Sequence, residues 1–495
     1  MTELLTPVPV TPALPIPAPA PGRRPARVAR PNRAIRSVHL VGICGSGMKA
    51  LAELASDLGW QVTGSDLLPS TPALAWMAAR GLRVHQGHRQ EFLPGHVDAL
   101  VYSPAVEPDN PERLAAAALG IPQFSYSGML GLLMRERIGV CVAGTHGKST
   151  TSAMTATILE HAGLAPSAVV GAELCGRGAS GWGGTGKLFV VESCEYRHSF
   201  LDLSPKYACI LSVEPDHFDC FADFDENKVA FASFAGNVHD GGLLLVNGDS
   251  PAALEAAAWT TARVETFSQR PGGDWWGTDS RQTAFGTRFR IFHRGAFFTE
   301  VLLAVPGEHN VSNALAASAL SHAAGAQPAD IREGLAEFQG IRRRFERVGS
   351  YRGVTIVDDY AHHPTAVRTT LATARQQFGR RRVWCAFQPH QVSRVRALID
   401  EFAVSFGDAD QVLVAPVFAA REAGTGGAAA MSELLAERIA AAGTNARFVP
   451  SLDQITATLD DEARPGDVLI TMGAGDIDRV HHELTGRLRR DHAAG

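Results

Sequence analysis

The stretch that decides the fold, residues 140–154, reads VCVAGTHGKSTTSAM. The apolar run at 138–143 predicts a buried strand, and apolar positions at helical spacing after the glycines predict a helix. A strand, a glycine-rich turn and a helix N-terminus in this order form a cradle for phosphate, in which Lys148 and Ser149 would reach the outer phosphate and its Mg²⁺. The form G-x-x-G-K-S is two residues shorter than the general Walker pattern. The sequence therefore predicts a nucleoside triphosphate site with the loop residues Gly144, Thr145, His146, Gly147, Lys148, Ser149 and Thr150.

Length and composition limit the classes of protein to which this chain can belong. At 495 residues it is too long for one hydrophobic core, and it predicts roughly three domains. A formal net charge of −5 gives no reason to expect a nucleic-acid partner. No uncharged apolar run approaches the ~18 residues that span a bilayer, and seven cysteines without a C-x-x-C pair suit a reducing compartment. We therefore expect a cytoplasmic protein that is not inserted in a membrane, with its oligomeric state left open.

Residues 1–36 differ in composition from the rest of the chain. They are rich in proline, alanine and arginine and offer almost nothing to bury, so they are expected to form a disordered tail. A secretory signal would need an unbroken apolar centre, which the prolines interrupt. We assign no chemistry to this tail.

Residues 37–137 are expected to form a Rossmann-like domain. A short apolar run is followed by GICGSGM at 42–48, a helix, and a second run that ends in Asp66. Glycines at such a turn let the backbone approach a pyrophosphate. The spacing is G-x-x-G-x-G, with Cys44 at the middle glycine site of the dinucleotide fingerprint. A nucleotide diphosphate other than NAD therefore fits as well.

In residues 138–340, three strand ends are expected to meet at one edge of a parallel sheet. They carry Ser149, Glu192 and His217. A carboxylate at a strand end beside a phosphate loop is where Mg²⁺ is usually held. A single histidine at a strand end is more often structural, but the convergence of three strand ends favours a ligand role for His217. Residues 241–305, with short β-type runs and Gly-Gly turns, predict an antiparallel section.

Two further segments carry polar residues at positions that suit ligand binding. Asn310 and Asn313 lie three residues apart at the start of an Ala-rich helix, where they could also simply cap it. Residues 341–495 resume a βαβ alternation and predict a second open α/β sheet. Its strand ends carry the sequences DDYAHHPT, QPHQVSR and GAGD, where such sheets bind ligands.

Together these motifs resemble the Mur ligase family. The resemblance runs from about residue 37 to the C-terminus and rests on GICGSGM, AGTHGKSTT, VVES, EPDHFD, GEHNVSNA, RRFE, DDYAHHPT, FQPH and TMGAGDI. It implies an α/β fold of three domains. These are a Rossmann-like UDP-binding domain (37–137), a central P-loop ATPase-like parallel sheet with an antiparallel section (138–340), and a C-terminal Rossmann-like α/β domain that presents the amino acid (341–495).

The member that the chain resembles most joins L-alanine to the lactyl carboxylate of UDP-N-acetylmuramate, in peptidoglycan precursor biosynthesis. With ATP and Mg²⁺ the carboxylate becomes an acyl phosphate, which the amine of L-alanine attacks. Such phosphoryl transfer requires charge neutralisation and alignment rather than a protein nucleophile. Closure of the third domain would exclude water from the acyl phosphate.

Position by position, the resemblance also implies roles for single residues. The residues expected to take part in catalysis are Lys148, Glu192, His217, Arg344, His363, His390 and Arg394. The nucleotide would contact the loop 144–150 together with Asn310, Asn313, Arg344 and Asp359. The UDP-sugar would contact Gly42, Gly45, Gly47, Ser65, Asp66 and Ser103, and Mg²⁺ would bind Ser149, Glu192 and His217.

The chain departs from the family pattern at several positions. Cys194 and Arg197 stand where relatives commonly have acids, so the surroundings of Glu192 are less acidic. Ala232 lies roughly where some sister ligases carry a carbamylated lysine, and we expect no modified lysine here. Gln391 replaces the usual arginine after FQPH, which weakens a phosphate or carboxylate role at that position.

Three other functions compete with this interpretation. A murein-recycling ligase would couple a whole peptide to the same UDP-sugar, and FQPH favours the enzyme that adds a single amino acid. A catalytically silent nucleotide-binding scaffold is disfavoured because Lys148, Ser149, Glu192 and His217 are all present. An NAD-dependent oxidoreductase is disfavoured by Cys44 and by the separate triphosphate loop.

Overall fold

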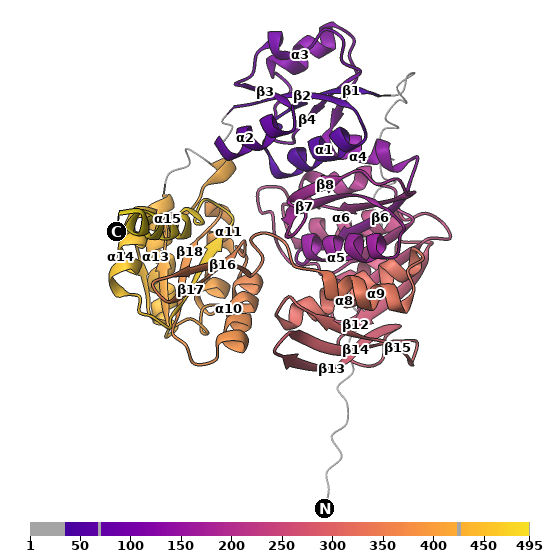
Figure 1. Cartoon of the computed structure of the whole chain (residues 1–495). Coiled ribbons are helices and arrows are strands. Elements are labelled where there is room, and N and C mark those ends of the chain that lie inside the picture. The colour runs from indigo at the N-terminus through magenta and orange to yellow at the C-terminus, as the bar shows by residue number, and fades with distance from the viewer. Residues whose placement is uncertain (1–34, 68–70, 423–426, 495) are drawn as a thin grey trace, which may run out of the picture.

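The computed structural model describes residues 35–67, 71–422 and 427–494. Three β-sheets follow one another along the chain and form three layered α/β bodies (Figure 1). The tail predicted at 1–36 lies outside the described residues except for its last two. Ile35 packs against the first core, and the Arg36 backbone N–H donates to the Asp98 carboxylate at 2.8 Å.

The first sheet is parallel throughout, with the strand order β3-β2-β1-β4-β5. Its order reverses between β1 and β4, which is where open α/β sheets form a ligand crevice. The strands are β1 (Ser37–Val41), β2 (Gln61–Asp66), β3 (Arg83–Gln86), β4 (Ala99–Tyr102) and β5 (Gln123–Ser125). The helices are α1 (Ser46–Asp57), α2 (Thr71–Ala79), α3 (Pro111–Ala118) and α4 (Tyr126–Met134).

The second sheet has ten strands in the order β15-β14-β13-β12-β11-β10-β6-β9-β7-β8. Its parallel strands are β6 (Ile138–Ala143), β7 (Ser167–Leu174), β9 (Leu188–Glu192), β10 (Tyr207–Ile210), β11 (Leu243–Asn247) and β12 (Arg263–Ser268); β8 (Ala179–Trp182), β13 (Trp275–Thr283), β14 (Gly286–His293) and β15 (Ala296–Leu303) complete it. The helices are α5 (Lys148–His161), α6 (Phe224–Gly236), α7 (Pro251–Ala257), α8 (Glu308–Ala323) and α9 (Pro328–Glu337), with a 3₁₀ segment at Tyr196–Asp202.

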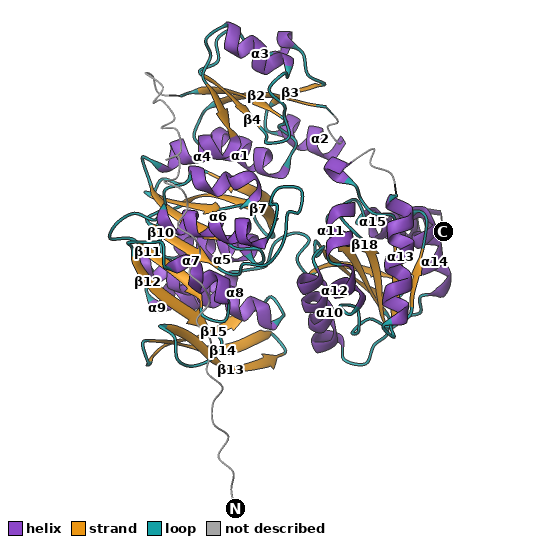
Figure 2. Cartoon of the chain, turned by 180° about the vertical axis from the view of Figure 1, so that it is seen from behind, coloured by secondary structure: helices purple, strands orange, loops and turns teal. Residues whose placement is uncertain are grey.

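The prediction of an antiparallel section over residues 241–305 is wrong for its first half. β11 and β12 continue the parallel sheet, because α6 and α7 return the chain to the same edge between successive strands. Within this segment β13 still joins β12 in parallel, and the antiparallel pairs are β13–β14 and β14–β15, in the ribbon at the bottom of Figure 1. Figure 2 shows from behind that these strands extend the sheet rather than form a separate unit.

The third sheet has the order β16-β17-β21-β18-β19-β20, parallel except for β16. The predicted βαβ alternation and open α/β sheet are present, and β16 is an additional edge strand. The strands are β16 (Glu346–Tyr351), β17 (Val354–Asp359), β18 (Val383–Gln388), β19 (Gln411–Val414), β20 (Ala446–Phe448) and β21 (Val468–Gly473). The helices are α10 (Pro364–Phe378), α11 (Val392–Ala397), α12 (Ile399–Ala403), α13 (Ala428–Ala441), α14 (Leu452–Glu462) and α15 (Arg479–Ala494).

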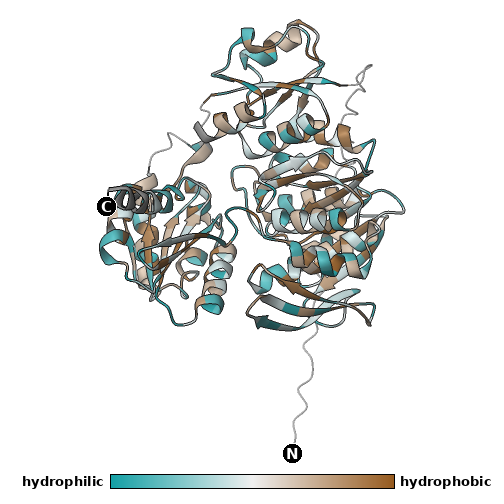
Figure 3. Cartoon of the chain, in the orientation of Figure 1, coloured by the Kyte–Doolittle hydropathy of each residue, from teal (hydrophilic) through white to brown (hydrophobic). Residues whose placement is uncertain are grey.

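Apolar strands covered by amphipathic helices build each core. The strands are mostly brown in Figure 3, and the outer helix faces are paler or teal, as expected for sheets covered on both sides. Among the described residues, no helix is long and apolar enough to cross a membrane.

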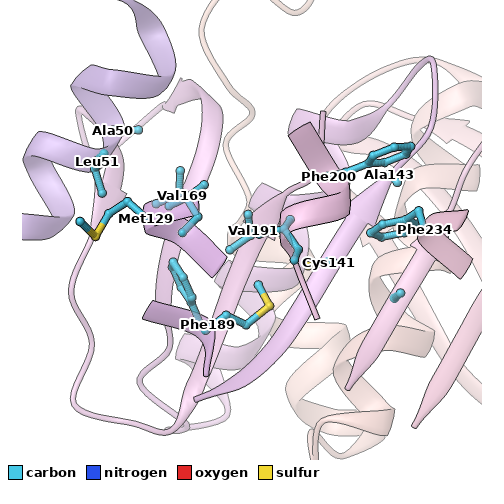
Figure 4. Close-up of a cluster of buried hydrophobic side chains, with 14 of the residues drawn as sticks. Ala50, Leu51, Met129, Cys141, Ala143, Val169, Phe189, Val191, Phe200 and Phe234 are labelled. Carbon is cyan, nitrogen blue, oxygen red and sulfur yellow. The ribbon is translucent and has the colours of Figure 1, made fainter. Parts of the chain in front are cut away.

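Helix α1 of the first domain packs directly on the edge hairpin β7–β8 of the central sheet. A Cβ added to Gly181 would lie 1.9 Å from the Ala50 carbonyl oxygen, so the close approach requires glycine there. The buried Glu53 carboxylate accepts the N–H groups of Ser180 at 2.7 Å and Gly181 at 2.6 Å. Figure 4 shows the apolar side of this contact, where Leu51 lies near the core of the central sheet. The first domain is thereby seated on the central one.

A buried polar network lies inside the first domain. The Glu112 carboxylate contacts His39 Nε2 at 2.5 Å, accepts the Ser65 hydroxyl at 2.8 Å and contacts His88 Nδ1 at 2.9 Å. Glu112 and His39 are fully buried. Burial raises the pKa of Glu112, but the hydrogen bonds with His39, Ser65 and His88 outweigh it and leave this pKa lowered. The carboxylate is therefore ionised and fully bonded.

Replacing Glu112 by alanine is expected to destabilise the first domain by about 3 kcal/mol, because it leaves a buried imidazole and hydroxyl without their partner. Urea unfolding of the variant measures this loss. Glu107→Ala, an exposed acid close by, serves as the control and should change the free energy of unfolding by less than about 0.5 kcal/mol. Equal stability of the two variants would contradict the assignment.

Candidate active site

The predicted phosphate loop joins β6 to α5. Gly147 precedes the helix with φ 81°, and a Cβ there would lie 2.4 Å from the Asn313 side-chain oxygen. Both the positive φ and the close approach require glycine. The loop thus turns its backbone toward the N-terminus of α5, with Ser149 and Thr150 buried in the first helical turn.

Lys148 is held by three acceptors at this loop. Its ammonium donates to the carbonyl oxygens of Gly144 at 2.5 Å and Thr145 at 3.2 Å, and it forms an ion pair with Glu195 at 2.9 Å. Burial lowers the pKa of Lys148, but the Glu195 carboxylate outweighs it and leaves the pKa raised. The lysine is therefore a fixed positive charge at the loop.

Glu195 is a site residue that the sequence reasoning missed. Only its place three residues after Glu192 could have indicated it. Its Oε1 lies 3.5 Å from His217 Nε2, and the Cys194 thiol lies within 4.8 Å of both ligand atoms. Glu195, Lys148 and His217 thus form one charged cluster next to the phosphate loop.

The three residues predicted to bind Mg²⁺ come from neighbouring strand ends. Ser149 opens α5, Glu192 ends β9, and His217 follows β10. The structure brings His217 to Glu195, whereas the Glu192 carboxylate accepts the Gly171 backbone N–H from β7. Hydroxyl and carboxylate oxygens at this edge fit a hard divalent cation.

His217 has an unusual backbone that a neighbouring carboxylate stabilises. Its φ is 54°, in the left-handed region, and its N–H donates to Asp216 Oδ1 at 2.7 Å. The same oxygen accepts Arg394 Nε at 2.8 Å and Nη2 at 2.6 Å. Burial raises the pKa of Asp216, but the Arg394 guanidinium and His217 hold it well below its usual range.

The pair between Asp216 and Arg394 joins the central domain to the third. Only 8% of Asp216 and 2% of Arg394 is exposed. His390 lies behind the pair, with its Nδ1 3.0 Å from Arg394 Nη1. In this arrangement Arg394 contacts the central domain, and the part in catalysis expected of Arg394 and His390 stays a prediction.

Two more contacts cross between the same domains. His363 caps α10 and its Nε2 lies 3.2 Å from the Pro215 carbonyl oxygen. Thr365 donates its hydroxyl to Glu214 Oε2 at 2.7 Å. The predicted strand-end motifs EPDH and AHHPT therefore meet, as the rule for parallel sheet edges indicates.

Asp359 and Arg344 are neighbours at the start of the third domain. The Asp359 carboxylate accepts the backbone N–H groups of Phe345 and Ala361, each at 2.8 Å. Burial raises the pKa of Asp359, and the positive charge of Arg344 opposes that rise. In this structure Asp359 fixes the RRFE turn, and the nucleotide contacts predicted for both residues stay predictions.

Asn310 and Asn313 lie inside α8 rather than at its cap, which is Gly307. Asn313 donates to the Asn310 side-chain oxygen at 3.1 Å, and Asn310 donates to the Pro306 carbonyl at 2.6 Å. With Asn313 against Gly147, the pair is aimed at the phosphate loop. A capping role is therefore wrong, and adenine contact stays a prediction.

The glycine-rich turn of the first domain follows β1, where the strand order reverses. Asp66 accepts the Cys44 backbone N–H at 2.9 Å, which orders the turn. Ser65, a residue predicted to contact the UDP-sugar, is fully buried instead. Its hydroxyl donates to Glu112, and its carbonyl oxygen accepts the N–H of Gly42. Ser65 thus shapes the turn from inside the domain. Of the remaining predicted UDP-sugar residues, the structure places Gly45 and Gly47 at the start of α1 and Ser103 just after β4.

A cavity of about 840 Å³ lies between the first and central domains. It begins next to the turn after β4 and contains two arginines, Arg113 and Arg197, from different domains. Arg197 donates to the Pro104 carbonyl oxygen and Arg113 to that of Val106. The lining also contains the carboxylates of Glu107 and Asp202, so the cavity carries charged groups of both signs.

Comparison with known proteins agrees with this geometry. Three family profiles match consecutive segments: "Mur ligase family, catalytic domain" at 37–138, "Mur ligase middle domain" at 142–321, and "Mur ligase, glutamate ligase domain" at 343–475. A UDP-N-acetylmuramate–L-alanine ligase of Salinibacter ruber is 39% identical over 92% of this chain and 96% of its own length. The chain belongs to the Mur ligase family.

Solved structures of other Mur ligases share the three-domain fold. A UDP-N-acetylmuramate–alanine ligase of Thermotoga maritima has a TM-score of 0.77 and 26% identity, covering 92% of this chain and 99% of that one. A murein peptide ligase of Psychrobacter arcticus has a TM-score of 0.69 and 26% identity, covering 92% and 98%. The predicted family and fold class are confirmed.

Removing Arg394 is expected to release the third domain of this Mur ligase from the central one. Arg394→Ala leaves the Asp216 carboxylate buried without its partner, which costs about 3–5 kcal/mol if the domains stay together. Small-angle X-ray scattering of the variant should show a larger radius of gyration than the parent chain. Arg396→Ala, two residues along α11, is the control, and equal scattering by both variants would contradict the prediction.

Proposed function

We propose that this Mur ligase joins L-alanine to the lactyl carboxylate of UDP-N-acetylmuramate, with hydrolysis of ATP to ADP and phosphate. The observation that supports it most is the contact of Lys148 with the loop and with the cluster of Glu195 and His217. That cluster provides the fixed positive charge and the ligand atoms that phosphoryl transfer requires. The names and coverage of the relatives favour this substrate pair, and the proposed reaction belongs to peptidoglycan precursor synthesis in the cytoplasm.

Each domain has a separate task in this proposal. Residues 37–137 hold the UDP-sugar, with Gly45 and Gly47 at its diphosphate. Residues 138–340 bind ATP at the loop, and residues 341–495 present L-alanine. The region before residue 37 has no proposed task.

The reaction then proceeds in two steps. An oxygen of the lactyl carboxylate attacks the γ-phosphorus of ATP, the bond to the β-phosphate oxygen breaks, and ADP leaves. The amine of L-alanine attacks the resulting acyl phosphate, and the tetrahedral intermediate expels phosphate as its proton is lost. Lys148 balances charge on the transferred phosphoryl group, and Arg344 adds to it when the domains close.

Mg²⁺ would be held by Ser149, Glu192 and His217, and it would neutralise phosphate charge. Glu195 supports these ligands from its position beside His217. His363 and His390, in the third domain, would lie near the amine of L-alanine.

The second candidate is a murein peptide ligase, because a solved protein of that kind shares the fold at the same identity. Phosphate release with ATP and UDP-N-acetylmuramate distinguishes the two. We expect release with L-alanine and little with L-Ala-γ-D-Glu-meso-diaminopimelate. The opposite preference would assign the chain to the recycling reaction, and no release with either would favour a silent scaffold.

Lys148→Ala is expected to lower phosphate release at least about 100-fold, since it removes the charge at the transferred group. Lys187→Ala, an exposed lysine just before β9, is the matched control and should keep full activity. A folded Lys148→Ala protein with near-normal activity would refute the role of the loop.

Glu195→Ala is expected to reduce activity about 10- to 100-fold, because Lys148 and His217 lose the carboxylate that orients them. Glu195→Asp should recover part of that loss. The same assay under saturating substrates measures it, and an alanine variant as active as the parent would leave Glu195 only a structural role.

A further inference from the structure

A second group of potential metal ligands lies at the contact between the central and third domains. His146 from the phosphate loop, Glu214 after β10 and His363 at the start of α10 place their ligand atoms within 4.8 Å of one another. Glu214 Oε2 lies 3.4 Å from His146 Nε2 and 3.9 Å from His363 Nδ1. Ligands about 2.1 Å from a tetrahedral centre lie about 3.4 Å apart, so these spacings suit one ion.

We propose that His146, Glu214 and His363 form a binding site for a divalent cation of the Zn²⁺ type, which bridges the two domains. Two imidazoles and one carboxylate are the ligand set that Zn²⁺ prefers, whereas Mg²⁺ prefers oxygen ligands alone. Three protein ligands leave a fourth position for water.

The hydrogen bonds around His363 orient it as a ligand. Its Nε2 faces the Pro215 carbonyl oxygen at 3.2 Å, an acceptor that requires the ring proton to be on Nε2. Nδ1 then carries the lone pair, which faces Glu214 and accepts only a long 3.3 Å hydrogen bond from Thr365 N–H. Metal-bound histidines commonly donate their other ring N–H to a backbone carbonyl in this way. Burial lowers the pKa of His363 to about 4, so the ring is neutral as a ligand must be.

The surroundings of Glu214 and His146 also suit a bound cation. The Thr365 hydroxyl holds Glu214 Oε2 at 2.7 Å. Burial raises the pKa of Glu214, but the neighbouring His146 and Thr365 outweigh it and lower this pKa to about 2. The carboxylate is therefore ionised. His146 Nε2 is buried and makes no hydrogen bond of good geometry within the described residues. A cation at the centre would satisfy it.

The site contains ligands from two domains, so a bound ion would link them. His146 and Glu214 belong to the central domain, and His363 belongs to the third. Zn²⁺ should therefore favour the docked arrangement even without substrates. This property is independent of the proposed ligase reaction, and its test uses neither nucleotide nor sugar.

Co²⁺ titration of the full-length, chelator-treated protein tests the site. We expect one equivalent of Co²⁺ to bind with the visible absorption of a tetrahedral nitrogen and oxygen site, and Zn²⁺ to displace it. His146→Gln and His363→Gln should each weaken Co²⁺ binding more than about tenfold. His146 caps no helix, so the His146→Gln variant remains informative even if His363→Gln disturbs the start of α10. Circular dichroism checks that each variant is folded.

Two controls separate this site from other clusters. Cys194→Ala removes the thiol of the neighbouring Cys194, Glu195 and His217 cluster and should leave the absorption unchanged. His161→Gln removes a surface histidine that also faces two carboxylates, Glu333 and Glu337, and should have no effect.

Three results would overturn the proposal. They are unchanged Co²⁺ affinity in both His146→Gln and His363→Gln, a thiolate-to-cobalt band that Cys194→Ala abolishes, and no stoichiometric binding by the parent chain. Scattering provides a second readout, since Zn²⁺ should reduce the radius of gyration of the parent but not of His363→Gln. An equal response of both proteins would also count against a bridging ion.

Discussion

The arrangement of the site depends on one buried carboxylate, that of Asp216. One of its oxygens accepts the N–H of His217 and both the Nε and Nη2 groups of Arg394. Burying a carboxylate is costly unless a charged partner and hydrogen bonds satisfy it. The charged partner is Arg394 of the third domain. The same interaction therefore stabilises the left-handed backbone of His217 and the docking of the third domain.

This interaction is possible because two parallel sheets present their carboxyl edges to each other. The loop after β10 carries Glu214, Pro215 and Asp216, and the loops after β17 and β18 carry His363 and lead to Arg394. The strands β6, β9 and β10 run parallel in the central sheet, as do β17, β18 and β21 in the third, so their polar end residues collect on one rim of each sheet. The facing rims bring chemistry-bearing residues from three loops together, although about 180 residues separate Asp216 from Arg394.

The sequence predicted the parts that local patterns specify. The strand, turn and helix of the phosphate loop and the buried strands follow from glycine spacing and apolar runs. The antiparallel edge strand β16 could not be predicted, because it is largely exposed and carries mixed polar residues without a clear period. The hairpin β7–β8 is mostly buried under α1, and that contact between domains has no local signal in the sequence. Likewise, the parallel direction of β11 and β12 depends on how α6 and α7 cross the sheet, which is a tertiary property.

The site residues follow the same division. Lys148 and His217 lie in motifs with their own chemistry, whereas Asp216 and Glu195 gain their importance only from partners far away in the chain. Arg343 is a further example, since its guanidinium donates to the Asp358 carboxylate at 3.0 Å and to the Gly473 carbonyl at 2.8 Å. Burial and pairing of this kind depend on the fold, so a motif without its partners does not reveal them.

The lysine of the phosphate loop shows how binding and site assembly are connected. An ammonium has three protons to donate, and Lys148 uses them on Gly144, Thr145 and Glu195. A phosphate oxygen can therefore accept a hydrogen bond from Lys148 only if one of these three acceptors loses its own. If Lys148 bound phosphate in place of Glu195, the Glu195 carboxylate would stay 3.5 Å from His217 Nε2 but would lose the positive charge of the lysine. A buried carboxylate in that position requires another cation, so in the proposed reaction a metal ion that accompanies the triphosphate would replace the charge of the lysine.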